Sequence, residues 1–533
     1  MKKRLKTRSK IGIFVFSVII GAAFFILATA FPHLTPFQYT LFRIILALAC
    51  AGVALLLPGL FNIRHKHLIG IVSGVIVFLL VYLLIPAVLA KDTGLWTHPA
   101  GLSDNISPDG QHTYNPNVAM DNNGNSIIVW EQSDGNNIQI FKSEYHNGQW
   151  IHPVDLTDNI SPDAQDVRYT QVAMDNKGNA IIVWVQSDGD QDQIFKSEYR
   201  NGRWSHPGSL KDNISPNETS ANFPTLAMDK NSNAIIVWSQ SDGNNEQIYK
   251  SEYRDSTWTL PADLTDNISP DGTRAHAPQV AMDIDGNAIV IWAQNDGSKD
   301  KLFKSEYRNG QWTHPTDLTD NISLDETRVE SFRLAMSRNH ALIVWNQYAK
   351  PDQVFKSEYR DGRWTLPTDL SDYISLKGAN AYLPRLAMDN EGNAIILWGQ
   401  ASQTADIKWQ FMKCEYRNGR WAKPEGFTEP MTSVDRKFIS LFKPAMDNNG
   451  NAIIVWLQHD GRNWQIFKNE YRKGRWSQAK GLSDSISPKS QDALNLDVKM
   501  DDNGNAIIVW EQSDGSYKQI FKSEYRIKRI ARW

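Results

Sequence analysis

The chain has 533 residues, 22% of them charged, and a formal net charge of −3. This length is enough for two or three domains of average size or one large repeat array, and the near-neutral charge provides no basic field for nucleic acid. The two cysteines, Cys50 and Cys414, exclude a disulfide framework and a CxxC-type metal site, and the 19 tryptophans favour β-structure.

Residues 1–92 are predicted to form a membrane anchor. Three apolar stretches, at about 11–31, 37–61 and 68–90, each contain more than 20 residues. A helix rises ~1.5 Å per residue, so each stretch can cross a hydrocarbon core ~30 Å thick. A buried core helix is the alternative for any one stretch, but three in succession favour three transmembrane helices.

The charges between these stretches predict the orientation. The N-terminal MKKRLKTRSK and the second loop, NIRHKH, are basic, whereas the first loop has no Lys or Arg. The positive-inside rule therefore places the N-terminus in the cytoplasm and residues 93–533 in the periplasm or outside the cell. Cleavage of a signal peptide after Ala28–Ala30 is the alternative, but the apolar stretch is longer than usual for one, which favours a retained helix.

Residues 93–533 form a repeat array. The word GNAIIVW occurs at Gly178–Trp184, Gly450–Trp456 and Gly504–Trp510, with close variants between these copies. Aligned on its last residue, the copies lie 53 to 58 residues apart, which indicates a repeat architecture. The eight aligned tryptophans are Trp130, Trp184, Trp238, Trp292, Trp345, Trp398, Trp456 and Trp510.

Each copy contains four short β-prone runs separated by Gly, Asn and Asp turns, without helical periodicity. The AIIVW run has no polar alternation, so it is expected to be covered on both faces. We therefore predict an all-β eight-bladed β-propeller of four-stranded antiparallel blades over 93–533. The outer WTHP-type run appears at Leu95–Pro99 before any blade and is missing after the last, so we expect Leu95–Pro99 to complete the eighth blade and close the ring.

Two polar patterns are interpreted as loops and not as ligand or modification sites. Asp121–Asn125 (DNNGN) and its copies lack the spacing of a calcium loop and match a tight hairpin. NIS triplets match glycosylation acceptors, but they recur at one repeat position, which favours a shared loop conformation. They begin at Asn105, Asn159, Asn213, Asn267 and Asn321.

The segments W-x-x-P, AMDxxGNAIxVW and Y-x-x-G-x-W, which recur from Leu95 to Arg526, resemble those of bacterial β-propellers in the broad sialidase-like and lectin-like group. The segment at 37–61 is similar to a helical module attached to varied bacterial domains. The resemblance implies a glycan-related function, and in hydrolytic sialidases an acid–base Asp, a Tyr–Glu pair and three arginines. Here Glu198 and Tyr199 recur in every blade, which favours a structural role, and no Asp-box is present.

Departures from the repeat suggest the candidate site. Blades five to seven change their turns, insert residues near 403–409 and alter the start of the seventh blade at Thr428–Lys443. Neutral drift is one explanation; the other is a sector reshaped around a ligand, with aromatic platforms and cationic contacts. The candidate ligand-binding residues are Trp409, Trp464, Arg333, Arg385, Lys350, Tyr348 and His459.

We therefore expect a membrane-anchored recognition module for a glycan, an envelope polymer or an envelope protein, since Asp/Asn loops and surface tryptophans suit sugars. A sialidase-like glycoside hydrolase or lyase and a purely structural scaffold are the alternatives. We predict no catalytic residue, metal or cofactor, because no GxSxG, HExxH, P-loop or GxGxxG context occurs. The expected partners are the lipid bilayer and the glycan or envelope ligand, and not nucleic acid.

Overall fold

A computed structural model describes residues 94–527 except 339, 402–408, 423, 425–438, 478 and 480. The three predicted transmembrane helices lie outside these residues. Within the described range, no helix is long and apolar enough to cross a bilayer. Residues Leu95–Arg526 form one unit.

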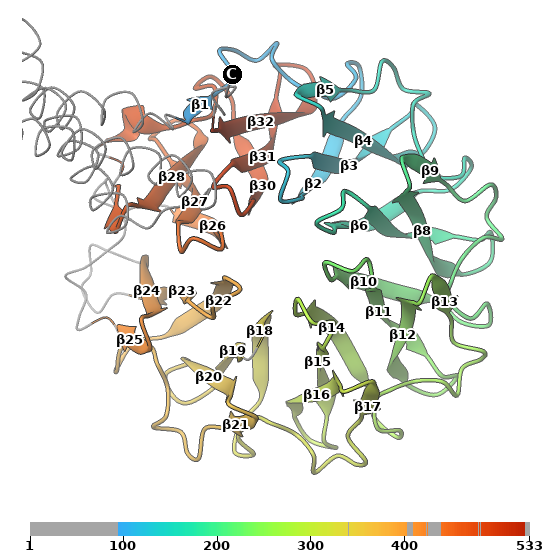
Figure 1. Cartoon of the computed structure of the whole chain (residues 1–533), viewed down its shortest axis with the longest axis vertical. Coiled ribbons are helices and arrows are strands. Elements are labelled where there is room, and N and C mark those ends of the chain that lie inside the picture. Colours follow the sequence, from blue (N-terminus) through green and yellow to red (C-terminus); the bar gives the residue numbers. More distant parts are fainter. Residues whose placement is uncertain are drawn as a thin grey trace, which may run out of the picture. The chain divides into compact units, whose positions relative to one another are not determined.

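This unit consists of eight four-stranded antiparallel sheets arranged as the blades of a propeller (Figure 1). The first strand of each blade is innermost, and the next two follow it outward. The innermost strands are β2 (Thr113–Met120), β6 (Val167–Met174), β10 (Ala221–Met228), β14 (Ala275–Met282), β18 (Val329–Ser337), β22 (Ala381–Met388), β26 (Ile439–Met446) and β30 (Ala493–Met500). The second strands are β3 (Ser126–Ser133), β7 (Ala180–Ser187), β11 (Ala234–Ser241), β15 (Ala288–Asn295), β19 (His340–Gln347), β23 (Ala394–Ala401), β27 (Ala452–His459) and β31 (Ala506–Ser513).

The two remaining strands of each blade form its outer part. The third strands are β4 (Ile138–His146), β8 (Asp192–Arg200), β12 (Glu246–Arg254), β16 (Asp300–Arg308), β20 (Gln353–Arg360), β24 (Trp409–Arg417), β28 (Trp464–Arg472) and β32 (Lys518–Arg526). The outermost strands are β5 (Gln149–Ile151), β9 (Arg203–Ser205), β13 (Thr257–Thr259), β17 (Gln311–Thr313), β21 (Arg363–Thr365), β25 (Arg420–Ala422), β29 (Arg475–Trp476) and, for the eighth blade, β1 (Leu95–Thr97). A short 3₁₀ turn, η1 (Leu482–Asp484), follows β29.

The repeated apolar word forms the second strand of every blade. In β11, Ile235, Ile236, Val237 and Trp238 are fully buried, because the two faces of the sheet pack against the neighbouring blades. The indole Nε1 of Trp238 donates a hydrogen bond to Oε1 of Gln240, 2.9 Å away, and the same Trp-to-Gln bond recurs in every blade. The motif therefore recurs because every blade needs the same second strand, buried on both faces of its sheet.

Ring closure follows the prediction. Strand β1 pairs antiparallel with β32, with Trp96 opposite Tyr525, so the start of the described chain supplies the outermost strand of the last blade. The Trp96 indole also donates a 2.7 Å hydrogen bond to Glu470 of blade seven. Closure thus completes the eighth sheet and also links it to its neighbour.

The same Trp-to-Glu link joins every pair of adjacent blades. In blade three, Glu252 of β12 accepts hydrogen bonds from Lys250 and Arg254 of its own strand and from Trp312 of the next blade, the last at 2.6 Å. The recurring glutamate is therefore structural, as expected. The outer-strand tryptophans are half-buried by this contact. The eight donors are Trp96, Trp150, Trp204, Trp258, Trp312, Trp364, Trp421 and Trp476.

The polar repeat motifs form the predicted loops. Oδ1 of Asp121 accepts hydrogen bonds from the backbone amides of Asn123 and Asn125, both at 2.8 Å, which is a hairpin-turn role. The serine of the NIS triplet is buried in four of the five copies, as at Ser161, where its hydroxyl donates to Gln139 and accepts from the amide of Ile140. The triplets thus dock each long loop onto its blade.

Candidate functional site

The innermost strands surround a cavity of about 560 Å³ on the propeller axis. Its wall includes residues from one equivalent position of the blades. This position lies three residues before the Met that recurs near the end of each innermost strand. We call these eight residues the channel ring: Asn117, Gln171, Thr225, Gln279, Arg333, Arg385, Lys443 and Asp497. All except Arg385 line the cavity. The residue just before that Met is Ala in seven blades and Lys499 in the eighth.

A β-bulge two residues earlier turns another side chain toward the mouth of the channel. The residue at this position has a left-handed φ in seven of the eight blades. In blades one to three it is Asn115, Tyr169 and Phe223, with φ values of 52°, 58° and 54°. The strand register shifts at each of them. Left-handed backbone at a residue other than glycine costs about 1–3 kcal/mol, and because it recurs around the propeller it is a feature of the blade, while the side chain carried there differs.

Two of these bulge residues form an aromatic platform at the cavity. The rings of Tyr169 and Phe223 lie with centroids 4.7 Å apart, and the side chains are 40% and 43% exposed. Both line the axial cavity together with the amide side chains of Gln171 and Gln279. Exposed aromatic faces beside amide donors and acceptors are typical of sites that bind polar ring compounds.

Two buried carboxyl groups hold the bulge of blade one. Glu131 and Glu511 directly follow the core tryptophans of blades one and eight, where the other blades carry uncharged residues. Asn115 donates its backbone amide to Glu511 (2.6 Å) and its side-chain amide to Glu131 (2.9 Å), and the amide of Thr170 also donates to Glu131. Burial raises the pKa of both carboxyl groups despite these bonds.

The Glu511→Gln variant is expected to melt a few degrees above the wild type at pH 7. Because the pKa of Glu511 is raised in the native state, this carboxyl ionises in the unfolded chain at a lower pH than in the folded one. Glu511 therefore lowers the free energy of unfolding as pH rises above about 4.5, its usual value. The glutamine keeps an acceptor for the Asn115 amide and has no charge to bury. Thermal melts at pH 7 and pH 4.5 test this, because the advantage should shrink at the lower pH; an equal difference at both would contradict it.

Cations dominate the opposite wall of the cavity. Lys443 of blade seven pairs with the buried Asp497 of blade eight at 3.0 Å. Arg333 donates to the carbonyl of Phe332 at 2.6 Å, and Arg385 donates to its own neighbouring carbonyl at 3.1 Å. No carboxylate among the described residues forms an ion pair with either arginine. Burial lowers the pKa of Arg333; burial, and then the charge of Arg333, lower the pKa of Arg385 to about 9.

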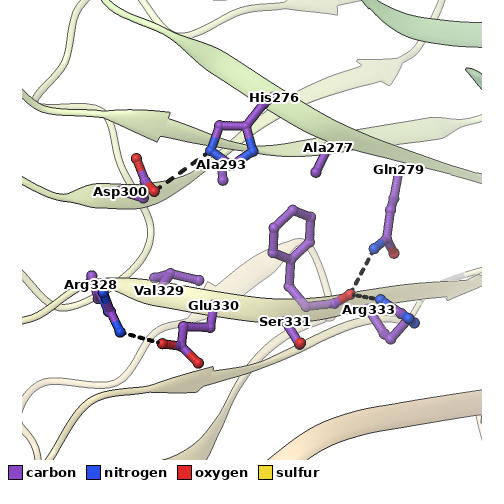
Figure 2. Close-up of a pocket in the computed structure, with 11 residues that line it drawn as sticks. His276, Ala277, Gln279, Ala293, Asp300, Arg328, Val329, Glu330, Ser331 and Arg333 are labelled. Atoms are coloured by element: carbon purple, nitrogen blue, oxygen red, sulfur yellow. Dashed lines mark hydrogen bonds and ion pairs between the residues drawn. The ribbon is translucent and has the colours of Figure 1, made fainter. Parts of the chain in front are cut away.

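A second pocket, of about 450 Å³, opens between blades four and five and shares Gln279 and Arg333 with the axial cavity. Figure 2 shows these two side chains converging on one backbone carbonyl, that of Phe332, to which Gln279 donates at 2.7 Å. His276 lies 3.6 Å from Asp300 on the far wall. Arg333 is thus reached from both the axial cavity and the pocket beside it.

The structure separates the residues that the sequence grouped into one sector. Arg333 and Arg385 belong to the channel ring. Tyr348 and Lys350 lie at the loop between β19 and β20, with the lysine Nζ 5.9 Å from the Tyr348 ring centroid. His459 and Trp464 form the corresponding pair in blade seven, with ring centroids 5.5 Å apart, and Trp464 packs partly against the core. The side chain of Trp409 lies outside the described residues.

Sequence reasoning missed Tyr169, Phe223, Lys443, Asp497 and Lys499 as cavity residues. For Lys443 and Asp497 a signal was present as a variable column inside an otherwise constant repeat. Seven of the eight innermost strands carry AM near their end and the eighth carries KM, yet the residue two before that pair changes from blade to blade. That variability has meaning only once the eight strands are known to face one axis.

Comparisons with known proteins find only distant structural similarity. No family model and no curated protein matches the sequence. Among solved structures, an ulvan lyase from a new family of polysaccharide lyases is 9% identical, with 79% of this chain and 94% of that chain covered and a TM-score of 0.44. The polysaccharide lyase Uly1 is 10% identical (72% and 93% covered, TM-score 0.42). The six-bladed fucose-binding lectin of Aleuria aurantia is 12% identical (58% and 94%, TM-score 0.31).

Proposed function

We propose that this protein is a membrane-anchored, extracytoplasmic recognition module that binds a glycan chain of the cell envelope at the mouth of its central channel. The observation that carries the proposal is the exposed Tyr169–Phe223 platform, directly beside a cavity lined by amide side chains. A sugar ring can stack its C–H face on an aromatic ring while its hydroxyl groups exchange hydrogen bonds with Gln171 and Gln279. The anchor rests on the three apolar stretches and the basic flanks of residues 1–92.

Changing the platform should weaken glycan binding. We expect Tyr169→Ala and Phe223→Ala each to cost ~1–3 kcal/mol, about five- to a hundredfold in affinity, because a stacked ring is removed from the centre of the site. A glycan array with the full-length protein in detergent would identify the ligand, and calorimetry would measure the loss.

Tyr348→Ala is the matched control, since this tyrosine is equally exposed (43%) but lies at the loop of blade five. If Tyr348→Ala weakened binding more than the platform variants, the reshaped sector of blades five to seven would be the site and the channel would not. If no glycan bound to the wild-type protein, the scaffold function would be favoured.

A glycoside hydrolase or lyase is the second candidate, because Glu131 and Glu511 form a carboxyl pair that occurs once in the ring. Both carboxyl groups are buried, at 4% and 0% exposure, and both hold backbone amides of the bulges or their neighbours. Because both carboxyl groups are buried and already accept structural hydrogen bonds, the arrangement favours binding over catalysis. New reducing or unsaturated ends in a bound polysaccharide, lost in the Glu131→Gln variant, would instead support the enzyme.

A further inference from the structure

The channel ring is electrically uneven around the axis. Blades one to four contribute the neutral side chains of Asn117, Gln171, Thr225 and Gln279. Blades five, six and seven contribute Arg333, Arg385 and Lys443, and the eighth contributes Asp497. Lys443 and Asp497 form an ion pair, at 3.0 Å. The two arginines of adjacent blades keep their charge without a carboxylate partner among the described residues.

The half-buried cations of the third strands are paired with carboxylates. Arg200, Arg254 and Arg472 of the third strands each bond the glutamate two residues before them. Within the described part of the chain, Arg333 and Arg385 each donate to a backbone carbonyl alone, although a guanidinium carries five donors. Two neighbouring charges that lack an anion repel each other, and this repulsion contributes to the lowered pKa of Arg385. An anion between them would relieve both the repulsion and the unmet donors.

We propose that Arg333 and Arg385 form an oxyanion subsite on the channel wall, which takes a carboxylate or sulfate group of an acidic polysaccharide. A planar guanidinium matches either group with two parallel hydrogen bonds. Lys499, exposed on the same cavity, adds a further positive charge, whereas Lys443 is neutralised by Asp497. Arg333 lines the same cavity as the Tyr169–Phe223 platform, so one ligand can stack on the neutral side and place its charge at Arg333, with the positive charge of Arg385 from the next blade adding to it.

The identity of the ligand as a polysaccharide rests on the proposed function, but the anion site itself does not. Calorimetric titration of the full-length protein in detergent with sodium sulfate and, separately, with sodium glucuronate, at constant ionic strength, measures the site directly. We expect binding of at least one anion to the wild type and a loss of tenfold or more in the Arg333→Gln/Arg385→Gln double variant. The anion that binds more tightly identifies sulfate or carboxylate as the natural group.

The Lys211→Gln variant, which removes one positive charge at an exposed position away from the channel ring, is a control that should bind as the wild type does. The Arg385→Lys variant keeps the positive charge but loses the planar guanidinium with its parallel N–H donors, so we expect it to bind more weakly yet measurably. This variant also provides a test if the double variant does not fold. Absence of sulfate and glucuronate binding to the wild type, or equal binding by Arg385→Lys and by the double variant, would overturn the subsite. A protein that bound neutral glycans but neither anion would keep the proposed function and lose this inference.

Discussion

Replacing Leu95–Pro99 with a Gly/Ser segment of equal length should destabilise the propeller more than any single substitution in the channel ring. The replacement removes strand β1, three residue pairs with β32, the 2.7 Å bond from Trp96 to Glu470 and the Lys468 ammonium 4.3 Å above the Trp96 ring. We expect the free energy of unfolding to fall by about 3 kcal/mol or more, because a packed tryptophan is removed and β32 becomes an open sheet edge. Thermal melting followed by tryptophan fluorescence measures the loss.

The same Gly/Ser replacement of Thr257–Pro261 in blade three is the matched control for ring closure. Trp258 occupies the same outer position in blade three and makes the same bond, to Glu198 at 2.7 Å, but its strand follows β12 directly along the chain. The difference between the two variants therefore reports closure by a strand from the other end of the repeat array. Equal melting temperatures for the Leu95–Pro99 variant and the wild type would refute a closing role for β1.

Acid should unfold the propeller cooperatively as pH falls below about 4.5. Burial raises the pKa of the third-strand glutamates, but the lysine, arginine and tryptophan donors around each carboxylate lower it by more. The pKa of the glutamate is therefore lowered in each of blades two to eight. A carboxyl group whose pKa is lowered in the native state stabilises the fold at any pH above its pKa in the unfolded chain. This stabilisation is lost as pH falls through the pKa of the native state. Near-UV circular dichroism from pH 7 to pH 2 follows the transition.

The Glu252→Gln variant isolates one of these carboxylates. At pH 7 we expect it to cost about 1.5–3 kcal/mol, the usual worth of hydrogen bonds to a charged group, because Lys250 and Arg254 lose their anion. The cost should shrink in acid, where the wild-type carboxylate is protonated too. Glu218→Gln, at an exposed loop position, serves as the control and should change little. A cost for Glu252→Gln that stayed constant from pH 7 to pH 3 would contradict the linkage.

Much of the fold could be predicted because its determinants are local and repeated. The unbroken apolar run ending in Trp238 indicates a strand buried on both faces, and eight copies at a near-constant spacing indicate the number of blades. The displaced run at Leu95–Pro99 even predicted how the ring closes. Each of these features depends only on the chain near one residue and on the number of its copies.

The candidate site could not be predicted in the same way. Arg333 and Arg385 were singled out as departures from the repeat, but they were grouped with Tyr348, Lys350, His459 and Trp464, which lie at the hairpin loops between the second and third strands. Tyr169 looked like an ordinary strand residue until the bulge gave it a φ of 58° and turned it to the channel mouth. The sequence by itself thus determined the blade, because strand periodicity and turn residues act over a few positions. Only the tertiary structure decided which residues meet at the axis, since residues about 50 to 380 positions apart become neighbours when the ring closes.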